Sequence, residues 1–330
     1  MGKRRAWAFA LAAAMCVAGF VLSLCMGAAN LSLAQLWRAL LSGPEDTAGY
    51  ILWYSRLPRA CASMLAGAAL SCAGCILQSV LGNKLASPSI VGVNAGAGLA
   101  VTLCCALGAL SGWAVAAASF GGALFSAALV VALAHLTGAS RTTVILSGVA
   151  LNSVLNALRD GVALLSPDAA MLGNEFRVGD FSAVTTARLL PAGTLIVLAL
   201  AVALTLSNEL DVLALGDETA ASLGMSVRRL RAVFVLLAAL LAGSAVSFAG
   251  LLGFVGLLVP HMARSFAGGQ SRYLMPLCML GGAGFVTLCD LAARMLFAPY
   301  ELPVGIIMAV LGGPFFLVLL LRQRGGHRDA

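Results

Sequence analysis

Ionisable residues that lie deep in apolar sequence are the first candidates for chemistry in this chain. Asp290 and Arg294 stand four residues apart within one long apolar run, so on a helix they share a face and can form an ion pair. Charged side chains at membrane depth are costly, and they commonly mark ion or substrate pathways. A structural ion pair near one end of the helix is the alternative, with equal weight.

Two amide side chains form a similar pair. Asn152 and Asn156 also stand four residues apart in an apolar run. Amides on one helix face either hydrogen-bond to neighbouring helices or line a hydrated path. We keep both interpretations, and the second makes Asn152 and Asn156 candidates for lining a translocation path.

The sequence offers little for nucleotide hydrolysis, thiol chemistry or metal binding. No segment has the G-x-x-x-x-G-K-[ST] pattern of a phosphate-binding loop, so we expect no ATPase site and no enzyme activity in this chain. Cys72 and Cys75 have redox spacing, but no charge lies near them in the sequence, and packing is the expected role. The three histidines, His135, His261 and His327, are widely separated, so neither a metal site nor another cofactor is expected.

The composition places these residues in a membrane. Of 330 residues, 61% are hydrophobic and 10% are charged, whereas soluble domains carry about a quarter charged residues. The mean hydropathy is +1.00. The net charge of +7 does not indicate nucleic-acid binding, because the basic residues sit in short loops where they set orientation in a bilayer. We therefore predict an all-α polytopic membrane protein that contacts lipid and no nucleic acid.

Apolar runs of about 20 residues predict the membrane spans. The first run follows the basic residues 3–5, as in a secretory signal with small residues at 27–29, but its length favours a retained span. The run 232–259 is too long for one helix, and the glycines between Gly250 and Gly256 offer a break. Ten spans result, at residues 6–28, 58–81, 89–110, 113–136, 142–165, 187–207, 230–250, 251–266, 273–297 and 302–321.

Two sequence echoes relate the halves of the chain. Leu65–Ile76 resembles Leu241–Leu252, and Phe120–Phe125 resembles Leu280–Phe285. The copies lie five spans apart, and an odd offset inverts them in the membrane, as in many transporters. We therefore predict an inverted repeat of spans 2–5 and 7–10 within a single transmembrane permease domain, residues 1–330.

The loops predict the orientation and one docking element. Basic residues are concentrated on the side that carries both chain ends, so both termini are expected in the cytoplasm. The cytoplasmic loop at about 208–231 contains an amphipathic helix, Leu213–Met225, with acidic residues near its start and Gly224 near its end. Such a helix lies on lipid or on a partner protein.

Several motifs run in order from about residue 50 to the C-terminus. They are Arg56-Leu-Pro-Arg59, Asn83-Lys-Leu-Ala-Ser-Pro88, Leu215-Gly-Asp-Glu-Thr-Ala-Ala-Ser-Leu-Gly224, Gly253-Phe-Val-Gly-Leu-Leu-Val-Pro-His-Met-Ala-Arg264, Glu301-Leu-Pro-Val-Gly305 and Gly312-Gly-Pro-Phe315. Together they resemble the permease subunits of ABC transporters for iron-siderophore, haem and cobalamin uptake (FecCD/BtuC-like). The resemblance implies ten spans per subunit, a homodimer around a central path, two ATP-binding subunits inside and a substrate-binding protein outside.

The resemblance also assigns roles to individual residues. Arg56 and Arg59 match arginines that receive glutamates of the binding protein, and Arg294 matches a third. Anchoring at lipid headgroups is the alternative for the first two, and Asp290 would partly neutralise Arg294. The residues that match the coupling helix, which presses into the ATPase, are Asp217, Glu218, Ala221, Leu223 and Gly224.

We therefore expect the permease subunit of an ABC importer in the cytoplasmic (inner) membrane, driven by a separate ATPase. A ferric siderophore or other iron chelate is the expected substrate because that is the largest branch of the family, with haem or cobalamin as the alternative. An ion-driven secondary transporter is the alternative of another class, and the scarcity of intramembrane acids argues against it.

Overall fold

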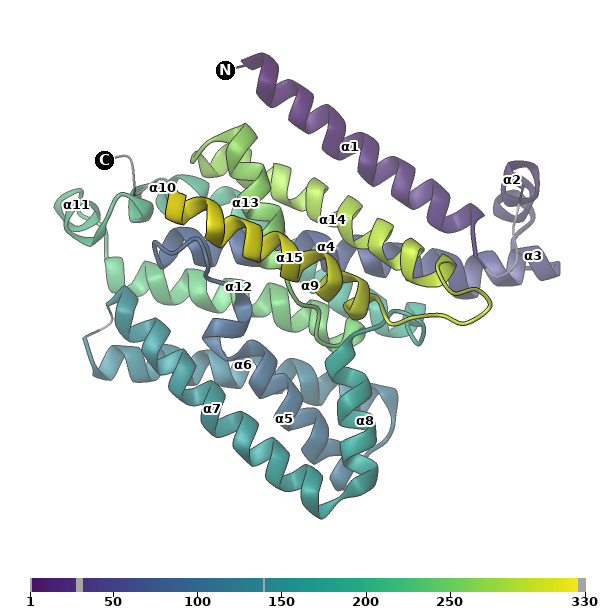
Figure 1. Ribbon diagram of the computed structural model, residues 1–330, viewed down its shortest axis with the longest axis horizontal. Coiled ribbons are helices and arrows are strands. Elements are labelled where there is room, and N and C mark those ends of the chain that lie inside the picture. The colour runs from purple at the N-terminus through teal and green to yellow at the C-terminus, as the bar shows by residue number, and fades with distance from the viewer. Residues whose placement is uncertain (1, 28–31, 139, 326–330) are drawn as a thin grey trace.

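The computed structural model describes residues 2–27, 32–138 and 140–325. Over these residues the chain is helical, and no strand is assigned. Figure 1 shows long helices lying side by side, with short helices near both ends of the bundle. We call the two ends the α3 end and the α11 end, after the short helices α3 (Thr47–Tyr50) and α11 (Asp217–Ser222).

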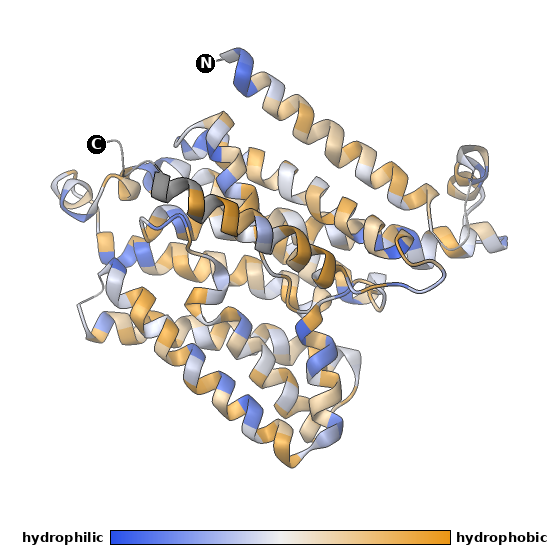
Figure 2. Ribbon diagram, viewed as in Figure 1, coloured by the Kyte–Doolittle hydropathy of each residue, from blue (hydrophilic) through white to orange (hydrophobic). Residues whose placement is uncertain are grey.

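Six described helices are long and apolar enough to cross a membrane. Figure 2 shows apolar residues along them, while hydrophilic residues gather near helix ends and on α7 (Arg141–Leu165) and α8 (Pro167–Val178). The protein is therefore a multi-pass membrane protein. One of the six is the continuous helix Thr47–Val80, which consists of α3, the π-helical turn η1 (Ile51–Arg56) and α4 (Leu57–Val80). The other five are α1 (Gly2–Cys25), α6 (Gly112–Leu136), α9 (Thr186–Thr205), α12 (Val227–Ala249) and α14 (Ser271–Met295).

Shorter or more polar helices complete the described chain. They are α2 (Leu33–Ser42), η2 (Pro88–Val91), α5 (Val93–Ala106), α7 (Arg141–Leu165), α8 (Pro167–Val178), α10 (Ser207–Ala214), α11, α13 (Val255–Ala267) and α15 (Val304–Gly325). Each expected span coincides with a helix, and the expected break is confirmed because α12 ends at Ala249 and α13 begins at Val255. The number of membrane crossings and the inverted repeat stay predictions. Ala28 and Ala29, in the small-residue segment expected after the first span, lie outside the described residues.

Helix α4 lies at the centre of the packing, against α12, α13 and α14. Its backbone approaches its neighbours directly, because a Cβ at Gly67 would overlap the carbonyl oxygen of Gly282, and one at Gly74 would overlap Gly256. Small residues allow such close approach between helices in lipid. The Gln78 amide, which is 3% exposed, donates to the Gly256 carbonyl oxygen at 3.2 Å, so α4, α13 and α14 form one tightly joined unit.

A second group of helices surrounds α5, which packs against α6, α7 and α8. The buried residues of α7, Val144, Gly148, Leu151 and Leu155, recur at helical spacing and mark a single packed stripe. The rest of α7 is exposed or half-exposed in this single chain. Helix α7 therefore has a free face that another copy of the chain or lipid would cover.

Candidate functional site

A buried ionic cluster lies at the α3 end. Asp290, on α14, has no exposed surface, and the Arg59 guanidinium on α4 donates to both of its carboxylate oxygens at 3.0 to 3.1 Å. Arg294 contacts the same carboxylate, with Nε 3.3 Å from Oδ2. Arg59 also reaches Glu301 at 2.6 Å and Asp180 at 3.8 Å. We call these five residues the Asp290 cluster.

Arginines at this end also hold the C-terminal end of α1. The Arg56 Nη1 atom donates to the carbonyl oxygens of Leu24 and Cys25 at 2.7 and 2.8 Å, and Arg294 Nη2 donates to Ser23 Oγ at 2.7 Å. The last carbonyl groups of a helix have no partner within the helix, and positive charge there is favourable. The two arginines therefore tie α1 to α4 and α14.

The three arginines that were expected to receive the binding protein lie together, but they are not on an open rim. Arg56, Arg59 and Arg294 are 5%, 7% and 6% exposed. Their guanidinium groups are engaged with the chain itself, and the exposed edge of the cluster belongs to acids. The side chains of Glu301 and Asp180 are 41% and 33% exposed.

A second ionic cluster lies at the α11 end. The Asp217 Oδ1 atom is 2.6 Å from Arg231 Nη2 and 3.2 Å from Arg141 Nε. Arg141 also donates to the Leu213 carbonyl oxygen at 2.8 Å. Arg141 begins α7, and Arg231 lies in the first turns of α12. We call Asp217, Arg141 and Arg231 the Asp217 cluster, and it ties α11 to both helices.

The neighbouring α10 anchors the same segment from the other side. Leu210 and Leu213 are fully buried, and the Ser271 backbone N–H at the start of α14 donates to Asp211 Oδ1 at 2.8 Å. Gly216, with φ of 124°, separates α10 from α11 in a conformation that side chains rarely adopt. The single amphipathic helix expected over this stretch is therefore two short helices joined at Gly216.

The residues expected to couple to an ATPase fall into two groups. Glu218, Ala221, Leu223 and Gly224 are exposed, and Leu223 is 63% exposed although it is apolar. Asp217 instead faces two arginines of its own chain. Helix α11 therefore has an open surface with an apolar side chain beside it, while Asp217 attaches it to α7 and α12.

The two amides of α7 also differ. Both are half-exposed, and the Asn152 Nδ2 atom donates to the Ser89 carbonyl oxygen at 2.8 Å. Among the described residues, no hydrogen-bond partner is found for Asn156. Asn152 thus joins α7 to the segment before α5, while Asn156 is available to a path or a partner.

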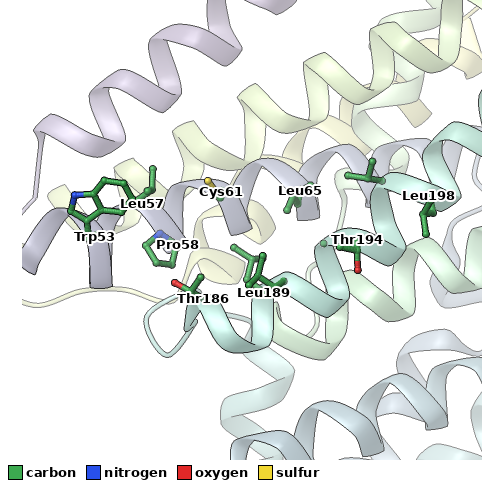
Figure 3. Close-up of a pocket in the computed structure, with 12 residues that line it drawn as sticks. Trp53, Leu57, Pro58, Cys61, Leu65, Thr186, Leu189, Thr194 and Leu198 are labelled. Carbon is green, nitrogen blue, oxygen red and sulfur yellow. The ribbon is translucent and has the colours of Figure 1, made fainter. Parts of the chain in front are cut away.

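An apolar cavity of about 620 Å³ lies between the η1–α4 helix and α9. Figure 3 shows Trp53, Leu57 and Pro58 on one wall and Thr186 and Leu189 on the other. None of its described lining residues is charged. A cavity of this kind between apolar helices suits lipid chains better than a polar substrate.

Taken together, the chain is a membrane protein built from glycine-packed apolar helices, with an ionic cluster at one end and an anchored, exposed short helix at the other. The model of the FecCD transport family matches residues 15–322. The chain belongs to the FecCD transport family.

Individual relatives resemble the chain over nearly its whole length. The Fe(3+) dicitrate transport system permease protein FecC of Escherichia coli is 38% identical over 97% of this chain and 97% of its own. The hemin transport system permease protein HmuU of Yersinia pestis is 34% identical over 91% and 90%. A solved metal-chelate type ABC transporter in an inward-facing conformation superposes with a TM-score of 0.84, at 27% identity over 95% of this chain and 98% of that one.

Members of this family are permeases of ABC transporters, and they work with ATPase and binding-protein components. The chain is therefore a permease of a family whose members include iron-siderophore and haem uptake proteins, and the role of that family is transport. This family membership replaces the ion-driven carrier that the sequence alone left open.

Proposed function

We propose that this chain is the permease subunit of an ABC importer that carries a ferric siderophore or a related iron chelate across the cytoplasmic membrane. The observation that carries the proposal is the exposed α11, which the Asp217 cluster fixes to α7 and α12, on a chain of the FecCD family. Relatives named for Fe(3+) dicitrate and ferric enterobactin support an iron chelate. Haem is the second candidate, supported by the hemin transport relative.

The proposed assembly has two copies of the chain, two ATP-binding subunits and one extracytoplasmic binding protein. The α11 end faces the cytoplasm, together with both termini, and the α3 end faces the binding protein. Closure of the ATPases on ATP moves α11, and the ion pairs from Asp217 to Arg141 and Arg231 pass this displacement to α7 and α12. The path between the two copies, lined by α7 and α15, then changes the side to which it opens.

A direct test begins with gentle purification of the tagged chain from its native membrane and mass spectrometry of the proteins that accompany it. We expect a stoichiometric ATPase. The complex with its binding protein is then placed in liposomes and supplied with ⁵⁵Fe-labelled ferric citrate, ferric enterobactin or haem. ATP-dependent uptake of an iron chelate supports the proposal, uptake of haem alone moves the assignment to haem, and no accompanying ATPase contradicts both.

We also propose that the binding protein docks through Arg59. Its Nη1 atom is held by Glu301, whose side chain is 41% exposed, so a glutamate of the partner would compete with Glu301 for the same guanidinium. Because Glu301 competes with the partner's glutamate, neutralising Glu301 should strengthen docking and leave the rest of the Asp290 cluster intact. Arg56 and Arg294, held against α1, would then act by keeping Arg59 and its neighbours in place.

The docking test uses Glu301→Gln, which leaves the buried Asp290 untouched. We expect the variant to bind the binding protein more tightly and with a weaker dependence on salt, since the internal competitor has lost its charge. Immobilised transporter and purified binding protein measure the affinity. Unchanged affinity would place the docking contact elsewhere.

The amides of α7 give a separate test of the path. We propose that Asn156 lines it and that Asn152 does so only at its edge, because Asn152 is bonded to Ser89. Asn156→Leu should lower the uptake rate with little loss of thermal stability, whereas Asn152→Leu should lower both. Equal uptake by wild type and Asn156→Leu would remove Asn156 from the path.

A further inference from the structure

A cavity of about 310 Å³ lies where three segments meet: the end of α8, the chain between α12 and α13, and the start of α15. Its lining is apolar or glycine except for one side chain, Arg177. Ligand pockets of this size combine an apolar lining with a few polar groups that fix orientation. The composition of this cavity therefore fits a ligand with one anionic part.

Backbone contacts fix the walls of the cavity. The Leu251 N–H donates to the Phe176 carbonyl oxygen at 2.9 Å, and the Gly305 N–H donates to the Gly179 carbonyl oxygen at 3.2 Å. A Cβ at Gly305 would overlap the carbonyl oxygen of Val178. The glycine thus allows α15 to start directly against the end of α8. The backbone that follows Arg177 is therefore fixed against the start of α15.

The charge of Arg177 is not balanced within the described chain. Arg59 and Arg294 share Asp290, and Arg159 pairs with Asp160 at 2.7 Å. Arg177 is exposed and forms no ion pair with any residue that the structure describes. What distinguishes Arg177 from other exposed arginines is its place in the lining of this cavity, where an anionic ligand could supply the missing counter-charge.

A second pocket lies further along α15, toward the α11 end. Gly305 and Ala309 line the cavity, while Gly312 and Phe315, further along the helix, line the second, nearly filled pocket with Lys84. Phe254 lines both pockets, and its ring occupies the space that a Cβ at Gly312 would need. The Phe254 ring therefore forms the floor that separates the two pockets.

Phe254 also has an unusual backbone. Its φ of 63° is the one positive value outside glycine in the described part of the chain. A bulky residue in this region is strained, and such strain persists where the surroundings hold it for a functional reason. A floor at this point between two pockets is such a reason.

We propose that this cavity is a substrate station for an anionic metal chelate, in which Arg177 binds a carboxylate or catecholate oxygen of the chelate and Phe254 closes the way onward. The proposal rests on the function proposed above and narrows its substrate to chelates with a net negative charge. Guanidinium matches paired oxygen atoms by forming two parallel hydrogen bonds, which a lysine cannot reproduce. The glycine and aliphatic walls accept the rest of the ligand.

The experiment compares uptake of three ⁵⁵Fe-labelled probes by the complete transporter in liposomes. Ferric enterobactin and ferric citrate are anionic, and ferrioxamine B is cationic. We expect wild type to carry at least one anionic probe, and Arg177→Gln to lower that uptake about tenfold or more, as the loss of a charged hydrogen bond does. Arg177→Lys should recover part of the rate. Arg38→Gln, which changes an exposed arginine of α2 outside the cavity, is the matched control.

A second readout separates this site from a folding defect. Basal ATP hydrolysis and copurification of the ATPase should be the same in wild type, Arg177→Gln and Arg38→Gln. Wild-type rates for the anionic probes in Arg177→Gln overturn the station and leave the proposed function standing. Wild-type transport of ferrioxamine B alone also overturns the station, whereas transport of none of the three probes by wild type rejects the iron-chelate function with it.

Discussion

The two ionic clusters place arginines around one carboxylate at opposite ends of the bundle, but their surroundings differ. Asp290 has no exposed surface and joins membrane helices to each other. The Asp217 side chain is 42% exposed and joins a short surface helix to two membrane helices. One cluster joins buried parts of the membrane helices, and the other attaches a surface helix to the bundle.

Burial explains why the two clusters suit these roles. Buried charges are costly to leave unpaired. Because the Asp290 carboxylate is shared by an arginine of α4 and one of α14, separating these two helices would carry that cost. A half-exposed pair is screened by water and contributes less to stability, so loss of the Asp217 pairs should destabilise the chain less than loss of the Asp290 pairs. The comparison teaches that the same residue types contribute differently to stability according to their exposure.

The largest expected effect is on Asp290→Asn. The substitution leaves Arg59 and Arg294 buried without their shared counter-charge, and breaking a buried pair in this way costs about 3–5 kcal/mol. We expect a strongly lowered thermal denaturation midpoint of the purified chain and little protein in the membrane. An unchanged midpoint would contradict the structural role of this cluster.

Ser23→Ala tests a smaller part of the interactions around the Asp290 cluster. It removes the hydroxyl that accepts from Arg294 at 2.7 Å but leaves Asp290 in place. A lost hydrogen bond to a charged group costs about 1.5–3 kcal/mol, so the fall in the denaturation midpoint should be clearly smaller than for Asp290→Asn. A fall as large as that of Asp290→Asn would mean that the attachment of α1, and not the carboxylate, dominates.

Asp217→Asn removes the charge on which the Asp217 cluster depends. We expect little change in the denaturation midpoint, because the carboxylate is partly exposed, and a several-fold increase in ATP hydrolysed per substrate carried, because α11 is less firmly held. Both quantities are measured with the reconstituted complex. Leu223→Ala is the companion variant, and it should instead reduce copurification of the ATPase. A wild-type ratio of ATP hydrolysed to substrate carried in Asp217→Asn would contradict the proposed role of the Asp217 ion pairs in coupling.

The smallest effect is expected for the stability of Glu301→Gln. Its side chain lies at the exposed edge of the Asp290 cluster, and exposed ion pairs contribute about 0–1 kcal/mol. The denaturation midpoint should stay near that of wild type, which makes this variant the control for Asp290→Asn. A large fall would show that the buried character of the cluster extends to its edge.

The sequence predicted the helices and the local pairs well because these depend on neighbouring residues. The spacing of Asp290 and Arg294 predicted their ion pair, and the glycines after Ala249 predicted the end of α12. The contact of Arg59 with Asp290 joins residues that are 231 positions apart, and no periodicity reveals it. The sequence therefore predicted a partner protein's glutamate for Arg59, and it gave no sign of the internal partner Asp290.

Other features that the sequence did not predict also depend on contacts between distant parts of the chain. Helix α8 is short and mixed in polarity, so it carries no span signal, and with it the cavity around Arg177 was not foreseen. The contacts of Arg141 and Arg231 with Asp217 were not predicted either, because they arise only where α7, α11 and α12 meet. Only Gly216 held a local signal, since glycine before two acids suggests a helix start.

The direct contact of α4 with α14 has a consequence for chimeric transporters. Gly67 and Gly282 occupy the same point of closest approach, and neither accepts a Cβ while the other keeps its place. A chimera with FecC that exchanges one of these helices alone would combine surfaces shaped for different neighbours. The two helices form an inseparable module for recombination, although more than 200 residues separate their glycines in the chain.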